Sequence, residues 1–181
     1  MNDKSIKIKR ALLSVSDKTG LLDLAKALEE LKIEIISTGG TLKALSEGGI
    51  TAKDISEFSG SPEMMQGRVK TLHPKVHGGI LSRRELDLEE VEKNNIQEID
   101  LVVVNLYPFE ETIKKEDVSL DEAIENIDIG GPTMIRAAAK NFHHVAVISS
   151  SNSYTKFTKE LLETKECSFQ TRLDLASEAF E

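Results

Sequence analysis

The feature that most constrains the fold is the alternation of short apolar runs with helical stripes. The sequence predicts strands over residues 6–15, 33–37 and 50–58. Between them, residues 19–31 and 42–47 carry apolar side chains at helical spacing. Short connections between alternating strands and helices are typical of a parallel sheet covered by helices. The sequence therefore predicts an α/β domain with a mainly parallel sheet.

The second half of the chain continues this pattern. Leu101-Val102-Val103-Val104 is an unbroken apolar run, as expected for a strand buried on both faces of a parallel sheet, and residues 145–149 form a last predicted strand. Helices are predicted over residues 80–95, 119–126, 133–141 and 153–163. Met64 and Met65, in the turn region before the central basic segment, are predicted to fill the core.

The length and charge restrict the class of protein. A chain of 181 residues with 39% hydrophobic side chains suits one domain with its own core. The formal net charge of −8 disfavours binding to nucleic acid or to an anionic membrane. An anionic ligand therefore needs a local basic pocket.

The single cysteine, Cys167, allows no internal disulfide and favours a reducing compartment. It stands in a polar tail and is expected to be incidental. No stretch approaches the length of a membrane span, and the apolar run after the basic N-terminus is short for a signal peptide. We therefore expect a soluble, cytoplasmic protein.

Residues 67–79 form a basic segment in this acidic chain. Within it, Arg68 offers a fork of donors, Lys70 a point charge and Thr71 a hydroxyl, which together suit a phosphate or a polar planar ring. The alternative is a solvated surface loop, the usual fate of a charge run. His73 and His77 lie four residues apart in the same segment, but no cysteine or metal-binding motif accompanies them, so no metal site is expected.

Two turns follow predicted strands and precede predicted helices. Residues 16–19 (Ser-Asp-Lys-Thr) and 38–41 (Thr-Gly-Gly-Thr) place small residues, hydroxyls and free backbone N–H groups at helix N-termini. Ligands of parallel sheets bind outside the carboxyl ends of the strands, where both turns belong. The pair predicts a phosphate cradle, and the alternative is two ordinary helix caps.

Four other polar side chains are candidates. Asn105 and Tyr107 follow the 101–104 strand and reach the same edge of the sheet. Asp128 lies between two isoleucines ahead of Gly-Gly-Pro, where it either serves the site or caps the next helix. Lys140 falls three residues after Ala137, so it shares the inward face if Met134 and Ala137 point inward, and the alternative is a partner of the helix dipole.

Taken together, these motifs resemble one family. The blocks at residues 14–20, 38–41, 67–74, 105–109, 127–131 and 136–141 are similar, in order, to the IMP cyclohydrolase domain of the bifunctional purine biosynthesis enzyme, which joins AICAR transformylase to IMP cyclohydrolase. Thr38 replaces the family's serine and keeps the hydroxyl.

The resemblance implies a three-layer α/β/α fold like that of methylglyoxal synthase, over residues 1–165, with residues 166–181 starting a connection to a transformylase domain. It implies ring closure of 5-formamidoimidazole-4-carboxamide ribonucleotide to IMP with loss of water, the last step of de novo purine biosynthesis. It also implies a homodimer and no metal or organic cofactor, because 10-formyltetrahydrofolate serves only the transformylase.

The resemblance also implies roles for individual residues. Lys140 is the expected proton-transfer residue, and Lys70, Tyr107 and Asp128 are expected to surround the reacting amide and formyl groups. The expected phosphate cradle consists of Ser16, Lys18, Thr38, Gly39, Gly40 and Thr41. The further expected substrate-binding residues are Asp17, Thr19, Arg68, Val69, Thr71, Val104, Asn105, Ile129 and Gly130.

Two other functions of the same fold stay open. One is a regulatory domain that binds a phosphate or nucleotide without chemistry, and the other is methylglyoxal synthase itself. A regulatory domain has no use for Lys70, Tyr107, Asp128 and Lys140 together. Methylglyoxal synthase shares the phosphate cradle but would not need the blocks at residues 68–74 and 137–141, so the sequence favours the cyclohydrolase.

Overall fold

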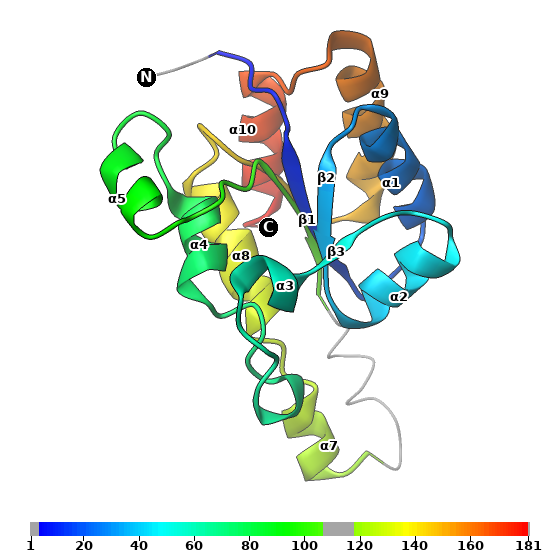
Figure 1. The fold of residues 1–181 in the computed structure, drawn as a ribbon. Helices are drawn as coiled ribbons and strands as arrows, with labels where there is room; N and C mark the ends of the chain where they lie inside the picture. Colours follow the sequence, from blue (N-terminus) through cyan, green and yellow to red (C-terminus); the bar gives the residue numbers. More distant parts are fainter. Residues whose placement is uncertain (1–3, 107–117, 181) are drawn as a thin grey trace.

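The centre of the molecule is a five-stranded sheet with the strand order β3-β2-β1-β4-β5 (Figure 1). The computed structural model describes residues 4–106 and 118–180. The strands are β1 (Arg10–Val15), β2 (Glu34–Ser37), β3 (Lys53–Asp54), β4 (Leu101–Asn105) and β5 (Ala146–Ile148). Each neighbouring pair is parallel, which confirms the predicted sheet.

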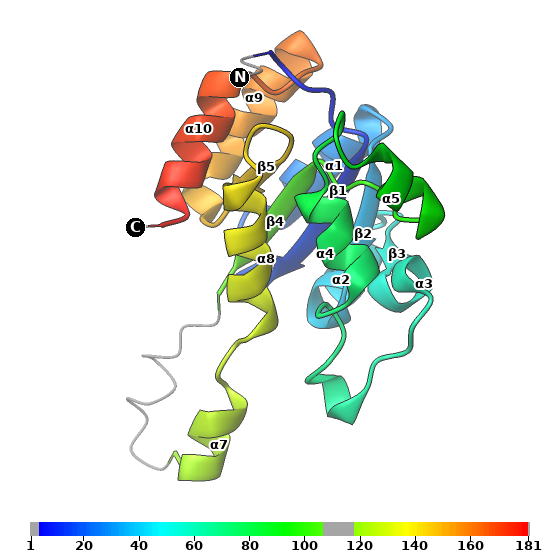
Figure 2. The ribbon, with the colours of Figure 1, turned by 90° about the vertical axis from the view of Figure 1, so that its left-hand side faces the viewer.

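Helices cover both faces of the sheet. The strands bury alternate side chains in two separate cores, because successive residues of a strand point to opposite faces. One face packs against α1 (Leu21–Glu30), α2 (Gly39–Glu47) and α9 (Tyr154–Thr164). The other face packs against α3 (Ile55–Ser59), α4 (Pro74–Leu81) and α8 (Gly130–Lys140), and Figure 2 shows α4 beside α8 in front of the sheet. The three-layer α/β/α architecture is thereby confirmed.

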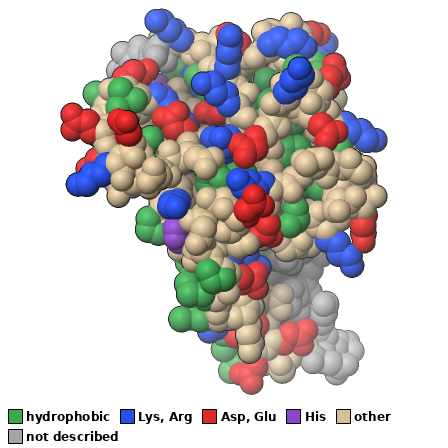
Figure 3. Space-filling view, in the orientation of Figure 1, with side chains coloured by type: hydrophobic (Ala, Val, Ile, Leu, Met, Phe, Trp, Pro, Cys, Tyr) green, Lys and Arg blue, Asp and Glu red, His purple; other side chains and the backbone are tan. Residues whose placement is uncertain are grey.

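The remaining elements are short or lie at the edges. α5 (Leu88–Lys93) follows α4, and α10 (Phe169–Glu178) packs against β5 and α8. Two 3-10 turns, η1 (Met65–Gly67) and η2 (Ser151–Ser153), precede α4 and α9. α7 (Leu120–Glu125) and the chain around η1 project beyond the carboxyl ends of the strands (Figures 1 and 2). In the space-filling view, hydrophobic side chains gather on this projecting part (Figure 3).

The third strand differs from its prediction over residues 50–58. Only Lys53–Asp54 pairs with β2, and the chain then turns into α3. The Asp54 carboxylate accepts the N–H of Ser56 at 2.7 Å, which caps the new helix at its first turn. Ile55 and Phe58 are three residues apart, so one helical face brings both into the same core, whereas a strand would point them to opposite faces.

Two other predictions were wrong. The helix expected over residues 80–95 is interrupted: α4 ends at Leu81 and α5 covers only Leu88–Lys93. Met64 and Met65 do not fill the core, because 45% and 72% of their surfaces are exposed. They belong to the projecting loop around η1.

The C-terminal segment packs into the same body as the sheet. Cys167, expected to be incidental, is 1% exposed, and Arg172 is completely buried. The Arg172 guanidinium donates hydrogen bonds to the backbone carbonyls of Lys4, Phe142 and Cys167 at 2.8, 2.8 and 2.6 Å. The expected domain boundary after residue 165 therefore coincides with no break in packing, and the connection to a second domain stays a prediction.

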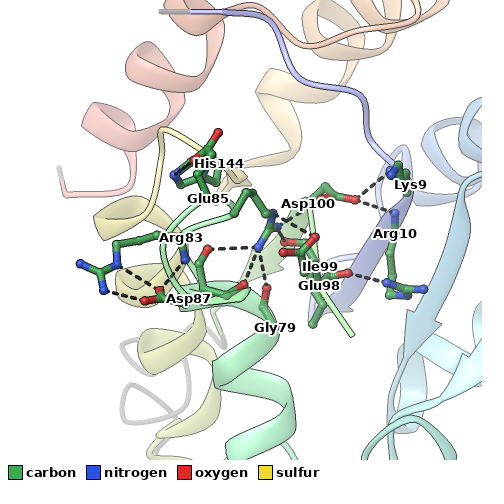
Figure 4. A network of polar contacts seen from close by, with 12 residues as sticks. Lys9, Arg10, Gly79, Arg83, Glu85, Asp87, Glu98, Ile99, Asp100 and His144 are labelled. Atoms are coloured by element: carbon green, nitrogen blue, oxygen red, sulfur yellow. Dashed lines mark hydrogen bonds and ion pairs between the residues drawn. The ribbon is translucent and has the colours of Figure 1, made fainter. Parts of the chain in front are cut away.

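A polar network fixes the amino-terminal ends of β1 and β4 (Figure 4). The Asp100 carboxylate accepts the backbone N–H groups of Lys9 and Arg10 at 2.8 and 3.1 Å, and Arg84 forms an ion pair with it at 3.2 Å. Charge-assisted bonds of this kind are stronger than neutral ones. They hold the register of the two central strands from the end opposite the candidate site.

Within residues 4–106 and 118–180, none of the helices combines the length and apolar character that crossing a bilayer requires.

Candidate active site

A cavity of about 770 Å³ lies at the carboxyl edge of the sheet. One wall comes from the ends of β1 and β4 and from the start of α2, and the other comes from the η1 loop, α7 and the start of α8. The location follows the rule for parallel α/β sheets, because the strands end here and the next helices begin.

Asn105, the last residue of β4, organises the turn after β1. Its side-chain oxygen accepts the N–H groups of Ser16 and Asp17 at 2.6 and 3.0 Å, and its Nδ2 donates to the Asp17 carbonyl at 3.0 Å. The Ser16 hydroxyl donates to the Leu106 carbonyl at 2.9 Å. Asn105 thus holds the β1–α1 turn in place and also lines the cavity.

Thr41 fixes the start of α2 against the end of β1. The Thr41 hydroxyl donates to the carbonyl of Val15 and accepts its N–H, both at 2.9 Å, and it is buried. The N–H groups of Gly39 and Gly40 precede the first intrahelical bonds of α2, which Thr41 and Leu42 make to the Thr38 carbonyl. Within residues 4–106 and 118–180 these two N–H groups have no hydrogen-bond partner, and they lie with the positive end of the helix dipole at the cavity.

Two ammonium groups flank this helix start. The Nζ of Lys70 lies 3.9 Å from the position that a Cβ atom would take on Gly39, and the Nζ of Lys18 lies equally far from that of Gly40. The Lys18 ammonium donates to the carbonyls of Val15 and Ser16 at 2.8 and 3.0 Å, which holds it at the edge of the cavity. The arrangement provides an anion site with two cations and free backbone donors.

The central basic segment enters the cavity through a tight loop. Met64 and Val69 bond to each other through their backbones at 2.9 and 3.3 Å. Met65, Gln66 and Gly67 have φ angles of 53°, 56° and 92°. Positive φ is unfavourable for Met65 and Gln66, so the surroundings hold this loop in a strained conformation.

Arg68 and Lys70 in this segment both have acidic partners. The Arg68 guanidinium donates to the Glu125 carboxylate at 2.9 Å, which joins the η1 loop to α7 across the cavity. Lys70 pairs with Glu63 at 3.2 Å. Arg68 is 62% exposed, as the surface-loop alternative anticipated, whereas Lys70 is 29% exposed and Thr71 is buried.

The start of α8 is packed too closely for side chains on its glycines. A Cβ on Gly130 would lie 2.5 Å from the Thr71 hydroxyl, and one on Gly131 would lie 2.4 Å from the Asp128 carboxylate. Asp128 also accepts the N–H of Gly131 at 2.9 Å. Asp128 lies one residue before the N-cap, Ile129, and binds an N–H of the first turn of α8 while it also lines the cavity, so both of its proposed uses are compatible.

Two pKa shifts concern groups beside the site. The Thr19 hydroxyl and N–H both donate to the Asp17 carboxylate and lower its pKa. Burial lowers the pKa of His77, whose buried Nε2 has no hydrogen-bond partner in the described part of the chain. His73 uses its Nδ1 to accept the N–H of Lys75 at 3.1 Å and caps α4. No three His, Cys, Asp or Glu side chains in the described residues group as metal ligands.

The structure brings most of the predicted site residues together. Those that line the cavity are Ser16, Lys18, Thr38, Gly39, Gly40, Thr41, Arg68, Lys70, Thr71, Asn105, Asp128, Ile129 and Gly130. Asp17 and Thr19 do not line it, because their side chains bond to each other in the solvent-exposed turn. Val104 is buried within the sheet, and Val69 takes part in the loop through its backbone.

Two of the four expected catalytic residues are not placed in the cavity. Lys140 does not share the inward face with Met134 and Ala137, because its side chain is exposed whereas theirs are buried. It ends α8, about 15 Å along the axis from Gly130 at the usual helical rise. The expected inward face was wrong, and the catalytic role of Lys140 stays a prediction from the resemblance. Tyr107 lies outside the described residues.

Sequence reasoning missed the wall formed by the projecting elements. Gln66, Ile124, Glu125 and Asn126 line the cavity, and no motif marked them. One sequence feature could have indicated this wall: Glu125 is an acidic residue on a predicted short helix, three positions before Asp128.

Comparisons with known proteins agree with this fold and place the chain in a family. The MGS-like domain family matches residues 20–133, and the chain belongs to this family. The AICARFT/IMPCHase bienzyme family matches residues 138–181. The particular likeness is to the bifunctional purine biosynthesis protein PurH of Acetivibrio thermocellus, to which 176 residues are 55% identical. The expected family resemblance is thereby confirmed.

The comparisons also show how much of each relative is matched. The alignment with PurH covers 96% of this chain and 34% of that protein, so the chain spans about a third of its length. A solved structure described as the crystal structure of ForH superimposes with a TM-score of 0.86 at 38% identity, covering 94% of this chain and 89% of that one.

Proposed function

We propose that this chain is an IMP cyclohydrolase, which closes the ring of 5-formamidoimidazole-4-carboxamide ribonucleotide to give IMP and water. The observation that carries the proposal is the cavity itself. It joins an anion site at the start of α2 to Lys70, Asp128 and the start of α8. The 55% identity to a bifunctional purine biosynthesis protein supports the same substrate class.

The phosphate of the ribonucleotide belongs at the start of α2. The N–H groups of Gly39 and Gly40 and the ammonium group of Lys18 supply donors and positive charge there, which leaves Lys70 for the reacting groups. The base then extends toward Asp128 and Gly130 on the opposite wall, with Arg68 and Asn105 between them along the lining. A net charge of −8 makes this local cluster necessary for an anionic substrate.

The reaction forms one C–N bond and removes one water molecule. The carboxamide nitrogen attacks the formyl carbon and loses a proton, while the formyl oxygen gains one and becomes a hydroxyl. This hydroxyl gains a second proton and leaves as water while the former formamide nitrogen loses its own proton, so that the C=N bond of the new ring forms. Asp128 is suited to orient the amide as a hydrogen-bond acceptor. Lys70 and the N–H groups at the start of α8 are suited to stabilise charge on the oxygen. Because Lys140 lies outside the cavity, we assign protonation of the leaving oxygen to Lys70.

The proposal includes several expectations from the family resemblance. The reaction is expected to need no metal and no organic cofactor, and 10-formyltetrahydrofolate is expected to serve only a transformylase domain. A homodimer and a cytoplasmic location are expected as well.

Ring closure can be followed directly. The purified chain is mixed with the formylated ribonucleotide in the presence of a chelator, and IMP formation is recorded by absorbance. Rapid IMP formation that falls by orders of magnitude in Lys70→Ala is the expected result. Saturable IMP binding without turnover would contradict catalysis and indicate a regulatory binding domain. Loss of turnover in Lys140→Ala but not in Lys70→Ala would return the proton transfer to Lys140.

A further inference from the structure

Glu63 is a charged residue outside the cavity that contacts a residue of the cavity lining. Its carboxylate lies 3.2 Å from the Lys70 ammonium, and the Glu63 side chain is 51% exposed. Lys70 lines the cavity and Glu63 does not. Neither the motifs nor the mechanism above uses Glu63.

Gly67 is what allows Glu63 and Lys70 to meet. A Cβ on Gly67 would lie 2.8 Å from the Glu63 Oε1 and 3.2 Å from the Lys70 Nζ, so both charged groups occupy the space over this glycine. Its φ of 92° also favours glycine. The loop is closed by the N–H of Gly67 bonding to the Met64 carbonyl at 3.1 Å.

The ion pair determines where the Lys70 ammonium lies. A lysine side chain has four flexible carbons and many rotamers, so a free Lys70 would sample a wide volume at the cavity mouth. With Glu63 on one side, the ammonium lies beside Gly39 at the start of α2. The turn that contains Met65 and Gln66, closed by the Met64–Val69 bridge, returns the chain so that Glu63 and Lys70 lie side by side.

We propose that Glu63 is a positioning residue, which holds the Lys70 ammonium in the orientation that ring closure requires. The inference rests on the proposed function. Under this proposal the Glu63 carboxylate, although outside the cavity, affects the rate of turnover through Lys70. Substrate binding depends less on Glu63, because Lys18 and the α2 donors hold the phosphate independently.

The first experiment compares Glu63→Gln with Glu57→Gln. Glu57 pairs with Lys53 at 3.5 Å, and Lys53 is 30% exposed against 29% for Lys70, so this pair is a matched control away from the cavity. Glu63→Gln should lower kcat about tenfold and change KM about twofold or less, whereas Glu57→Gln should change neither. Glu63→Asp should recover part of kcat. In a Lys70→Ala background, Glu63→Gln should have almost no further effect, since the two residues act as one unit.

A second experiment does not depend on activity. The lysines are converted to ¹³C-dimethyl-lysine, and the Lys70 resonance is assigned through Lys70→Arg. Glu63→Gln should shift this resonance, and Glu57→Gln should shift only that of Lys53. An unshifted Lys70 resonance would overturn the proposal whatever the enzyme does. A shifted resonance with unchanged kcat would also overturn it, whereas an inactive wild-type chain would contradict the proposed function separately.

Discussion

At the scale of single residues, several side chains of the candidate site are already committed to the protein's own backbone. Asn105 holds the β1–α1 turn through four hydrogen bonds, and Thr41 holds the start of α2 through two. These residues shape the cavity before any ligand arrives. Pre-organised donors of this kind lower the cost of ordering on binding.

Substitution of Lys18 tests the proposed phosphate site at the residue scale. Lys18→Met removes one of the two ammonium groups beside α2, so the KM for the ribonucleotide should rise about tenfold or more while kcat changes less. Steady-state kinetics provide the measurement. Lys43→Met is the control, because Lys43 lies on the same helix with 76% of its side chain exposed and outside the cavity. An unchanged KM in Lys18→Met would remove Lys18 from the phosphate site.

The residue scale also shows where sequence reasoning succeeds. The Gly-rich turns and the Arg68–Thr71 segment lie at the cavity because short motifs at strand ends follow from topology. Lys140 could not be placed in this way. Three alanines made its helix face ambiguous, and the structure buries Ala137, Ala138 and Ala139 while Lys140 stays exposed.

At the scale of elements, some segments of the sequence suit a strand and a helix about equally well. Local capping and tertiary contacts decide which of the two forms. The parallel direction of the strands follows from apolar runs that alternate with helical segments, whereas their order in the sheet was not predicted. α3 replaced a predicted strand because Asp54 caps it. The pairing of η1 with α7 could not be predicted, since Arg68 and Glu125 are 57 residues apart in sequence.

Helix α10 depends on Arg172, which is buried among backbone carbonyls. Arg172→Met removes the side-chain donor of the carbonyls of Lys4 and Phe142 and leaves the Cys167 carbonyl with the N–H of Ile6 alone, so the free energy of unfolding should fall by about 3 kcal/mol. Urea unfolding measures this change. Lys156→Met, which alters a side chain 77% exposed, should change stability by less than about 0.5 kcal/mol.

Cys167 reports on the same helix. Burial raises the pKa of its thiol to about 12, so at pH 8 the folded protein should resist a thiol reagent. Arg172→Met should speed this labelling by loosening α10. Labelling as slow as in the wild type, together with unchanged stability, would contradict the role given to Arg172.

At the scale of the whole molecule, a polar network holds the amino-terminal ends of the central strands, and the candidate site lies at their carboxyl ends. Asp100 and its partners lock the amino-terminal ends of the central strands, and the carboxyl ends open into the cavity. The sequence indicated the fold class, the functional edge and most of the lining. It did not indicate the projecting wall, whose position depends on contacts between distant segments.

The most direct test of the central claim is a titration of the ¹⁵N-labelled chain with IMP, followed through its backbone amide resonances. If the nucleotide phosphate binds at the start of α2, the amides of Gly39 and Gly40 should show the largest shifts, with smaller shifts at Asp128 and Gly131. The exposed helix α5 should be unaffected. Saturable binding that shifts α5 or other distant amides and leaves Gly39 and Gly40 unchanged would contradict the assignment of this cavity as the nucleotide site.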